Sequence, residues 1–294
     1  MTGTNKQNFH KRLDRWFRQQ EEKEALIPVI HEIRKEHPHM SARLMYDKIH
    51  PETMGRDKFE AYCFSEGFKL TPPRNFRKTT DSTGVIRFPN LIEGREVTGV
   101  YRVFVSDITY YEMNGRFYFI TFIIDLYTRE IVGYSLSSNL RTKGTTLAAL
   151  QMMVRKIGAD QLDGAIFHSD GGGQYYEKEF IKLTTRLNMK NSMGKLVYDN
   201  SHAERVNGIL KNDYLIPYGP QSEVQLRLEL TRAVRNYNTG KPHRSLYGMT
   251  PTEFRETNSV KSLFIKKIRE TIEVENNSPS YFPTSTVQHH HQYV

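Results

Sequence analysis

The stretch that decides the fold class is YRVFVSDITYYEMNGRFYFITFIIDLYTREIVGYSLS, Tyr101 to Ser137. It contains three successive runs rich in β-branched and aromatic residues, which are typical of strands. Asn114-Gly115 lies between the first two runs and is a strong signal for a tight hairpin turn. We therefore expect Val103 to Ser137 to form a three-stranded antiparallel meander.

Helices and strands are expected to alternate after the meander. Residues 142–157 and 177–187 have a helical pattern, and short strands are expected at DGAIFHSD, residues 163–170, and NMKNSMG, residues 188–194. Three antiparallel strands followed by this alternation give a mixed sheet with helices on its faces. The predicted fold class is α/β, a ribonuclease-H-like mixed sheet with flanking helices.

A small all-α, helix-turn-helix-like domain is expected ahead of this core. Ser41 can cap its second helix, and its third helix is expected at residues 56–65. The last helix of such a unit enters a DNA major groove, which makes Arg56 and Lys58 candidate DNA contacts. The alternative is a three-helix domain that packs on protein. The first helix carries apolar residues at helical spacing, namely Leu26, Val29, Ile30 and Ile33.

The charge of the chain favours a polyanionic partner such as nucleic acid, because the formal net charge is +9. Part of this charge lies in KLTPPRNFRKTT, residues 69–80, which has four basic residues, two prolines and no acid. We interpret this stretch as a basic linker in which Arg74, Arg77 and Lys78 are candidate DNA contacts. The alternative is a solvated connector.

Composition also excludes some classes of protein. No apolar run approaches the roughly 20 residues needed to cross a bilayer, and the first residues lack the apolar stretch of a secretory signal. We therefore expect a cytoplasmic protein without a membrane partner. The single cysteine, Cys63, excludes a disulfide framework and a cysteine-rich zinc site.

Four parts are expected along the chain. They are a helical domain at residues 1–68, a basic linker at 69–96, the mixed-sheet core at 97–256, and a basic segment with a flexible tail at 257–294. Within the core, Thr250, Pro251 and Glu253 have the pattern of a helix cap with a capping box.

Two aspartates fall where the predicted strands would carry functional groups. Asp107 lies within VFVSDITYY, where an ionised carboxylate is costly to desolvate unless it is paired or holds a metal. Asp170, in HSDGGGQYY, ends the next long buried strand, at the edge where open mixed sheets place ligands. The glycines at 171–173 would let the backbone turn sharply and leave room for a bulky ligand. For Asp170 alone, a turn-capping role is an equal alternative.

A third carboxylate, Glu204, follows in the predicted helix SHAERVNGILK. Together with Ser201 it also has the pattern of a capping box, which is the structural alternative. Glu204, Asn207, Gly208 and Lys211 nevertheless share one helix face. An acid, an amide, a missing side chain and a cation suit a phosphate backbone better than a core. Asn207 and Lys211 are therefore candidate DNA contacts.

These three acids predict a metal site, because carboxylates gathered in one place repel one another until a cation binds. Ligand sets made only of oxygen select Mg²⁺ or Mn²⁺ over zinc. Two such ions, roughly 4 Å apart, would assist an in-line displacement at phosphorus. Asp107, Asp170 and Glu204 are thus the predicted catalytic residues and metal ligands, for two ions per active site.

The motifs that hold these residues resemble the orfB-type transposases of bacterial insertion sequences, the IS-three family, whose core is like retroviral integrase. In that family the D-D-E triad falls where Asp107, Asp170 and Glu204 stand, and a lysine corresponds to Lys211. There are departures from the pattern: Phe104 stands where tryptophan is common, and DGGGQ replaces DRGSQ. The resemblance runs from about Arg43 to Phe254, through PNLIEGREVTGVYRVFVSDITY, DLYTREIVGYSLS, HSDGGGQYY, SMGKLVYDNSHAERVNGILKNDY and YNTGKPHRSLYGMTPTEF.

The resemblance implies a function. The protein would cut the terminal inverted repeats of its element, and the freed 3′ hydroxyl would attack another phosphodiester in target DNA. Two DNA ends must meet for this step, so we expect at least a dimer on DNA, in the bacterial cytoplasm at the nucleoid. The resemblance also implies an upstream helix-turn-helix reading frame as a partner.

Two alternatives to an active transposase stay open. One is a nuclease with the same core that cuts but does not join, and the other is a DNA-binding protein with a decayed core. Retention of all three acids argues against decay.

Overall fold

The computed structural model describes residues 6–71, 88–194 and 201–258 of the 294-residue chain. The chain divides into two compact units, Met1–Arg255 and Glu256–Val294. Arg74, Arg77, Lys78 and nearly all of the expected C-terminal segment lie outside the described residues. Within the described ranges, no helix combines the length and the apolar content needed to cross a membrane.

Three helices form the N-terminal part, as the sequence predicts: α1 (Lys6–Glu36), α2 (Ala42–Ile49) and α3 (Arg56–Ser65). Ser41 caps α2, because its hydroxyl oxygen accepts a hydrogen bond of 3.3 Å from the backbone N–H of Leu44. Apolar side chains from the three helices and their connections form a separate small core, which includes Ile30, Met40, Met45, Phe59 and Cys63.

Two details of this part differ from the prediction. Helix α1 begins at Lys6, well before the predicted apolar positions 26–33, and is 31 residues long. Val29 is 44% exposed, because the buried face of α1 follows Leu26, Ile30 and Ile33 at intervals of four and three residues. Cys63 is buried, and burial raises the pKa of its thiol to about 11, so it packs as a neutral apolar group.

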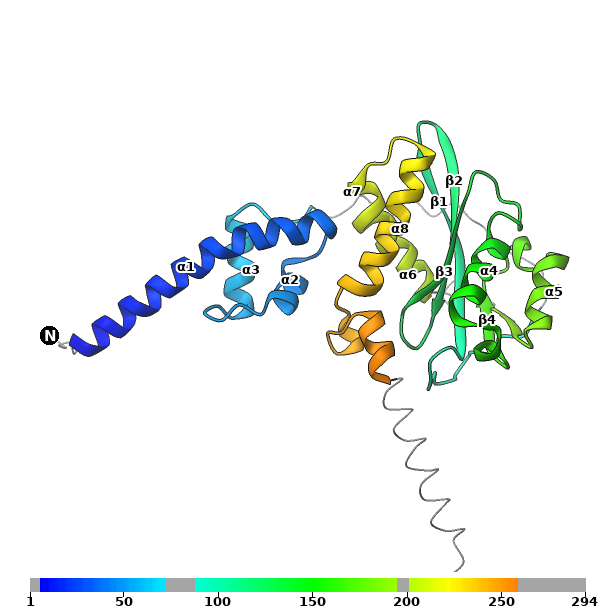
Figure 1. The fold of residues 1–294 in the computed structure, drawn as a ribbon, viewed down its shortest axis with the longest axis horizontal. Helices are drawn as coiled ribbons and strands as arrows, with labels where there is room; N and C mark the ends of the chain where they lie inside the picture. The colour runs from blue at the N-terminus through cyan, green and yellow to red at the C-terminus, as the bar shows by residue number, and fades with distance from the viewer. Residues whose placement is uncertain (1–5, 72–87, 195–200, 259–294) are drawn as a thin grey trace, which may run out of the picture. The chain divides into compact units, whose positions relative to one another are not determined.

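Among the described residues, five strands form one mixed sheet of order β3-β2-β1-β4-β5 (Figure 1). The predicted meander is confirmed, because β1 pairs with β2 and β2 with β3 in antiparallel fashion. Asn114 and Gly115 both have positive φ, 52° and 73°, as a two-residue hairpin turn requires. β4 and β5 then add in parallel next to β1. The strands are β1 (Val103–Met113), β2 (Arg116–Asp125), β3 (Ile131–Ser137), β4 (Ile166–Ser169) and β5 (Lys190–Met193).

Helices cover both faces of this sheet (Figure 1). On one face, α4 (Thr146–Ile157) and α5 (Lys178–Arg186) enclose a core with Phe104, Ile123 and Phe167. The other face holds a larger core beneath a second group of helices. These are α6 (Ser201–Ile209), the π-helix η4 (Leu210–Leu215), α7 (Ile216–Tyr218) and α8 (Glu223–Gly240).

The short elements complete the core. The 3₁₀ turns are η1 (Ala159–Leu162), η2 (Gly173–Tyr175) and η5 (Arg244–Leu246), and residues 251–258 are helical. The predicted capping box is confirmed, because the Thr250 backbone N–H donates to Glu253 Oε2 at 2.8 Å and the Glu253 backbone N–H donates to Thr250 Oγ1 at 3.3 Å.

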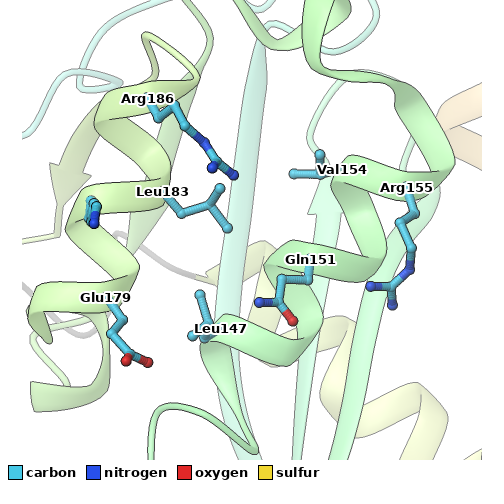
Figure 2. A pocket seen from close by; sticks show the side chains of 8 residues that line it. Leu147, Gln151, Val154, Arg155, Glu179, Leu183 and Arg186 are labelled. Atoms are coloured by element: carbon cyan, nitrogen blue, oxygen red, sulfur yellow. The ribbon is translucent and has the colours of Figure 1, made fainter.

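A groove of about 500 Å³ lies between α4 and α5 (Figure 2). Its walls carry Leu147, Gln151 and Arg155 from α4, and Glu179, Leu183 and Arg186 from α5. None of the predicted catalytic residues lines it. This groove is therefore separate from the predicted catalytic residues.

The packing of β3 on α4 gives the first testable prediction. A Cβ atom added at Gly133 would lie 2.5 Å from the carbonyl oxygen of Ala149 and 3.1 Å from Met153 Cβ. Because the clash is with helix backbone, Gly133→Ala is expected to lower the free energy of unfolding by about 3 kcal/mol. Urea unfolding measures this. Gly55→Ala, where a Cβ meets nothing within 4 Å, is the control; equal stabilities would contradict the prediction.

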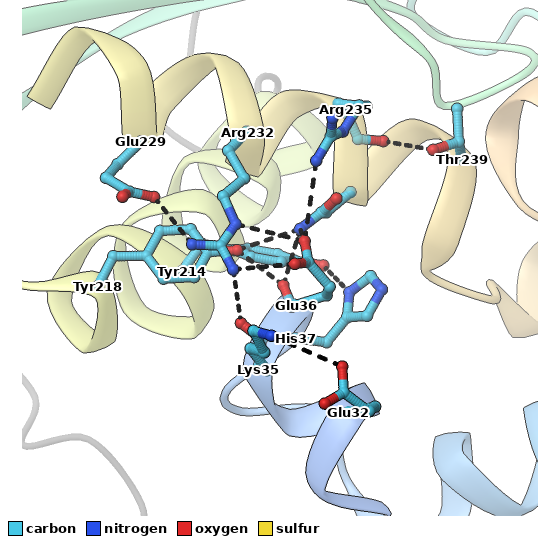
Figure 3. A network of polar contacts seen from close by, with 11 residues as sticks. Glu32, Lys35, Glu36, His37, Tyr214, Tyr218, Glu229, Arg232, Arg235 and Thr239 are labelled. Atoms are coloured by element: carbon cyan, nitrogen blue, oxygen red, sulfur yellow. Dashed lines mark hydrogen bonds and ion pairs between the residues drawn. The ribbon is translucent and has the colours of Figure 1, made fainter. Parts of the chain in front are cut away.

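The end of α1 joins the core through a polar network with η4, α7 and α8 (Figure 3). Glu36 accepts hydrogen bonds from Arg232 Nη2 at 3.0 Å and from Asn236 Nδ2 at 2.8 Å. The Tyr218 hydroxyl donates to the Glu36 carbonyl oxygen at 2.7 Å. His37 Nδ1 lies 2.9 Å from the hydroxyl of Tyr214. These bonds fix the last turn of α1 against the helices that cover the sheet.

This network should make the fold sensitive to acid. Burial, followed by the charges of Lys48 and Lys241, lowers the pKa of His37 to about 4, against about 6.5 for an unfolded histidine. The unfolded chain therefore binds the proton first, and stability is lost as pH falls from about 6.5 towards 4. At about pH 5 the loss from His37 is roughly 2 kcal/mol.

The check is urea unfolding of wild type and His37→Gln at neutral pH and at about pH 5. The variant is expected to lose less stability on acidification, and a control change at the exposed His31 should leave the wild-type pH dependence in place. Burial also lowers the pKa of His243 to about 4, so part of the acid sensitivity remains in the variant. Identical acid losses in wild type and His37→Gln would contradict the role of this ring.

Candidate active site

Asp107 and Asp170 lie next to each other at one edge of the sheet. β1 and β4 run parallel, and Ser106 is paired with Ser169. Each aspartate directly follows its serine, and neighbouring strands are about 4.8 Å apart. Because the two strands pair in parallel, Asp107 and Asp170 branch from neighbouring backbone positions, although they are 63 residues apart in the chain.

Glu204 lies within electrostatic range of both aspartates, on the first turn of α6. Burial raises the pKa of Asp107 to about 7, and the negative charges of Asp170 and Glu204 add to this shift. Burial also raises the pKa of Asp170, with a further contribution from Glu204. The negative charges of Asp170 and Glu204 thus oppose the ionisation of Asp107, and that of Glu204 also opposes the ionisation of Asp170.

Asn207 is the direct partner of Asp107. Its Nδ2 donates a hydrogen bond of 2.7 Å to Asp107 Oδ2. The side chain is only 6% exposed, so Asn207 does not lie on an open, DNA-facing surface as the sequence pattern predicted. The physical reason is that α6 packs on β1, which turns this position of the helix towards the sheet.

The three glycines after Asp170 have a different role from the one expected. None has a positive φ, so they do not provide a left-handed turn. A Cβ at Gly171 would lie 2.7 Å from Met193 Cε, and a Cβ at Gly172 would lie 3.1 Å from Asp170 Oδ1. The backbone N–H of Gly172 donates to that same oxygen at 3.2 Å. Two of the glycines therefore permit close packing, and only Gly173 borders open space.

Among the described residues, the other predicted DNA contacts are partly or fully exposed. Lys211 is in the π-helical turn η4, and its Nζ lies 4.5 Å from the centre of the Tyr110 ring. Arg56 and Lys58 are exposed at the start of α3, where Arg56 Nε forms an ion pair of 3.2 Å with Asp57. Their exposed position at the start of α3 fits a contact with DNA.

Sequence reasoning missed a buried pair behind the acids. The hydroxyl groups of Ser106 and Tyr175 lie 2.9 Å apart, and Ser106 Oγ also donates to the carbonyl oxygen of Phe122 at 2.9 Å. The negative charges of Asp170 and Asp107 contribute to the raised pKa of Tyr175, after burial. A serine directly before Asp107 in an otherwise apolar strand was the available signal, since a buried hydroxyl needs a partner.

The donor set fits hard divalent cations. All three acids offer oxygen ligands, and Asn207 Oδ1 is buried beside them without a hydrogen-bond partner among the described residues. The described residues contain no group of three His, Cys, Asp or Glu side chains arranged to hold one ion. Mg²⁺ is usually bound by one or two carboxylates together with substrate phosphates, so a closed cage is not required.

Comparisons with known proteins identify the family of the chain. Two family models, both described as integrase core domain, match residues 98–196 and 185–251. The insertion element IS600 uncharacterized 31 kDa protein of Shigella sonnei is 31% identical over 212 residues, which cover 69% of this chain and 75% of that protein. The putative transposase InsK for IS150 of Escherichia coli is 27% identical, covering 64% of this chain and 65% of that one.

Other relatives are matched over a smaller part. The putative transposase for IS986/IS6110 of Mycobacterium tuberculosis is 30% identical over 50% of this chain, which spans about half of that protein, 53%. Among solved structures, the magnesium complex of the HTLV-2 integrase catalytic core has a TM-score of 0.42 and 20% identity, over 57% of this chain and 98% of that chain. The chain belongs to the family of insertion-sequence transposases with an integrase core domain.

Proposed function

We propose that this transposase is of the orfB type of the IS-three family, that it cuts the terminal inverted repeats of its element, and that it joins the freed 3′ ends to target DNA. The observation that supports the proposal is that Asp170, at the end of β4, lies beside Asp107 in the middle of β1, with Glu204 in electrostatic range of both. Two partly buried carboxylates with a third, exposed acid in electrostatic range suit metal-assisted phosphodiester chemistry.

Each acid has a role in this proposal. Asp107 and Asp170 bind from the sheet, and Glu204 binds from α6, so that the three together hold two Mg²⁺ or Mn²⁺ ions. Bound ions would activate the attacking oxygen and stabilise the leaving oxygen of an in-line displacement. Asn207 orients the Asp107 carboxylate through its 2.7 Å hydrogen bond. The close packing at Gly171 and Gly172 holds Asp170 in place.

The proposal extends to partners. Joining requires two DNA ends in one complex, so we infer at least a dimer on DNA, with an upstream helix-turn-helix frame product as a further partner. The helices α1 to α3 would read repeat DNA through Arg56 and Lys58, and the linker would add Arg74, Arg77 and Lys78. A DNA-bound enzyme of this kind would act at the nucleoid.

The test is an assay of end cleavage and strand transfer on the DNA that flanks the coding sequence, with Mg²⁺ or Mn²⁺ and with a chelator as control. Cutting and joining that both need the metal ion support the proposal. Cutting without joining would identify a nuclease instead. Binding without either reaction would identify a DNA-binding protein with a decayed core.

Lys211 gives a separate prediction about DNA affinity. Its ammonium group lies beside the catalytic helix and is partly exposed, so it is placed to contact one phosphate. Lys211→Ala is expected to weaken binding of DNA ends and to reduce the slope of log affinity against log salt by about 0.9. Fluorescence anisotropy over a salt series measures both. An unchanged slope would show that Lys211 contacts no phosphate.

A further inference from the structure

The strand that carries Asp107 has an open edge beyond the active site. β4 pairs with β1 only from Val103 to Ser106. From Asp107 onward, no other strand of the described residues pairs with this edge, while β2 pairs with the opposite edge as far as Met113. The backbone of β1 on this side is therefore not covered by another described strand beyond Ser106.

Two exposed aromatic rings lie at this part of the hairpin. Tyr110 is 39% exposed and Phe117 is 51% exposed. Their ring centres are 5.6 Å apart at an interplanar angle of 81°, so the edge of one ring meets the face of the other. Large aromatic rings left at a surface need an explanation when they lie together and close to a site.

Lys211 completes the cluster. Its ammonium group lies over the Tyr110 ring, 4.5 Å from the ring centre, in a cation–π contact. Tyr110 thereby holds the cation at a defined place and contacts Phe117 with the same ring. The three side chains come from β1, β2 and η4, so the cluster is built by the fold and not by neighbours in sequence.

The surrounding charges favour one orientation for an anionic ligand. Glu112 is exposed and lies opposite Phe117 in the β1–β2 register, so it repels a phosphate on that side. Lys211 attracts a phosphate on the other side, towards the catalytic helix α6. A nucleotide that binds here would direct its phosphate to Lys211 and its base to Phe117.

The distance to the acids fits one DNA strand. Lys211 is seven residues after Glu204 along the helix formed by α6 and η4, which corresponds to about 10 Å. Paired DNA rises about 3.4 Å per nucleotide and an unpaired strand extends further, so this is a span of at most about three nucleotides. A strand whose scissile phosphate lies at Asp107 therefore reaches the cluster within its last few nucleotides.

We propose that Tyr110, Phe117 and Lys211 bind one unpaired nucleotide near the DNA end, with its base stacked on Phe117 and its phosphate on Lys211. The inference rests on the proposed function, since it concerns the same DNA end. The base must be unpaired, because an aromatic ring stacks only on a base face that duplex neighbours do not cover. The cluster thus holds the end open on the side of the active site.

The experiment uses the full chain and a short duplex with an unpaired 3′ overhang, which carries 2-aminopurine at each overhang position in turn. Binding is followed in a chelator, so no cleavage is needed. Stacking on an aromatic ring changes 2-aminopurine fluorescence, and wild type is expected to show this change at one overhang position. Phe117→Leu, which keeps an apolar side chain without the ring, should lose the change and bind the overhang about tenfold more weakly.

Three further variants separate the roles. Phe117→Tyr keeps a ring and should restore the fluorescence change. Tyr110→Leu should reduce both the change and the salt dependence, because it frees Lys211. Tyr247→Leu removes a ring that is 86% exposed elsewhere in the core and should bind as wild type does.

The outcomes also distinguish the two proposals. If wild type cuts and joins DNA ends but Phe117→Leu shows the same fluorescence change as wild type, this inference alone is wrong. The same holds if the blunt duplex binds Phe117→Leu tenfold more weakly too, since the ring would then contact paired DNA. If wild type binds no DNA end and has no activity, the proposed function itself fails.

Discussion

Asp107→Asn is expected to reduce both end cleavage and strand transfer by at least about a thousandfold, because the amide cannot replace a carboxylate as a ligand of the catalytic ions. Binding of DNA ends should stay near the wild-type level. The side chain keeps its shape, so a loss of both reactions would be chemical rather than structural. Matched cleavage and joining assays, with anisotropy for binding, measure the three quantities.

The same variant is expected to fold well. In wild type, Asp107 is a partly buried acid whose ionisation is opposed by burial and by Asp170 and Glu204. A neutral amide removes this repulsion, so the thermal midpoint of metal-free Asp107→Asn should equal or exceed that of wild type. A lower midpoint would mean that inactivity reflects misfolding.

Metal addition separates the roles further. Mg²⁺ or Mn²⁺ binds the folded site only, so it should raise the thermal midpoint of wild type and leave that of Asp107→Asn almost unchanged. Asp160→Asn changes an exposed aspartate in η1 and should respond to metal as wild type does. An Asp107→Asn protein that still joins ends would overturn the assignment of the acids.

Most of the core could be predicted because its signals are local. The hairpin turn at Asn114-Gly115 and the change from strand to helical periodicity after Ser137 are each contained in a few residues. Parallel addition of β4 next to β1 then follows from the general rules of mixed sheets. For the same reason, the proximity of Asp107 and Asp170 could be predicted from the sequence.

The details that escaped prediction depend on packing between distant segments. The pattern of Glu204, Asn207 and Lys211 assumed one regular helix, but the helix changes to π geometry at Leu210 and α6 packs on β1. Asn207 consequently turns inward to Asp107, and Lys211 reaches Tyr110. No periodicity in the sequence contains these contacts, because each joins residues about a hundred positions apart.

The glycines at 171–173 also include a tertiary contact that the sequence did not predict. In the sequence they suggest a sharp turn with open space, yet Met193 of β5 fills the space at Gly171. Whether a glycine borders open space or permits close packing depends on its neighbours in the tertiary structure. The retained acids could be predicted from residue type, whereas the side chains that position them could not.

Asn207→Asp is the second change with a large expected effect. It removes the Nδ2 donor that lies 2.7 Å from Asp107 Oδ2 and places a carboxylate there instead. Two carboxylates at this distance cannot both ionise easily, so one of them holds a proton and Asp107 becomes a poorer ligand. We expect cleavage and joining to fall by about a hundredfold, through loss of one positioning bond and added repulsion.

The comparison of three variants isolates this cause. Asn207→Ala removes the hydrogen bond without adding charge and should lose less activity than Asn207→Asp. Asn212→Asp adds the same charge in η4, away from Asp107, and should stay close to wild type. Raising the Mg²⁺ concentration should recover part of the loss in Asn207→Asp, because the cation competes with the shared proton. If Asn207→Asp is as active as wild type at low Mg²⁺, the hydrogen bond to Asp107 does not position the catalytic carboxylate.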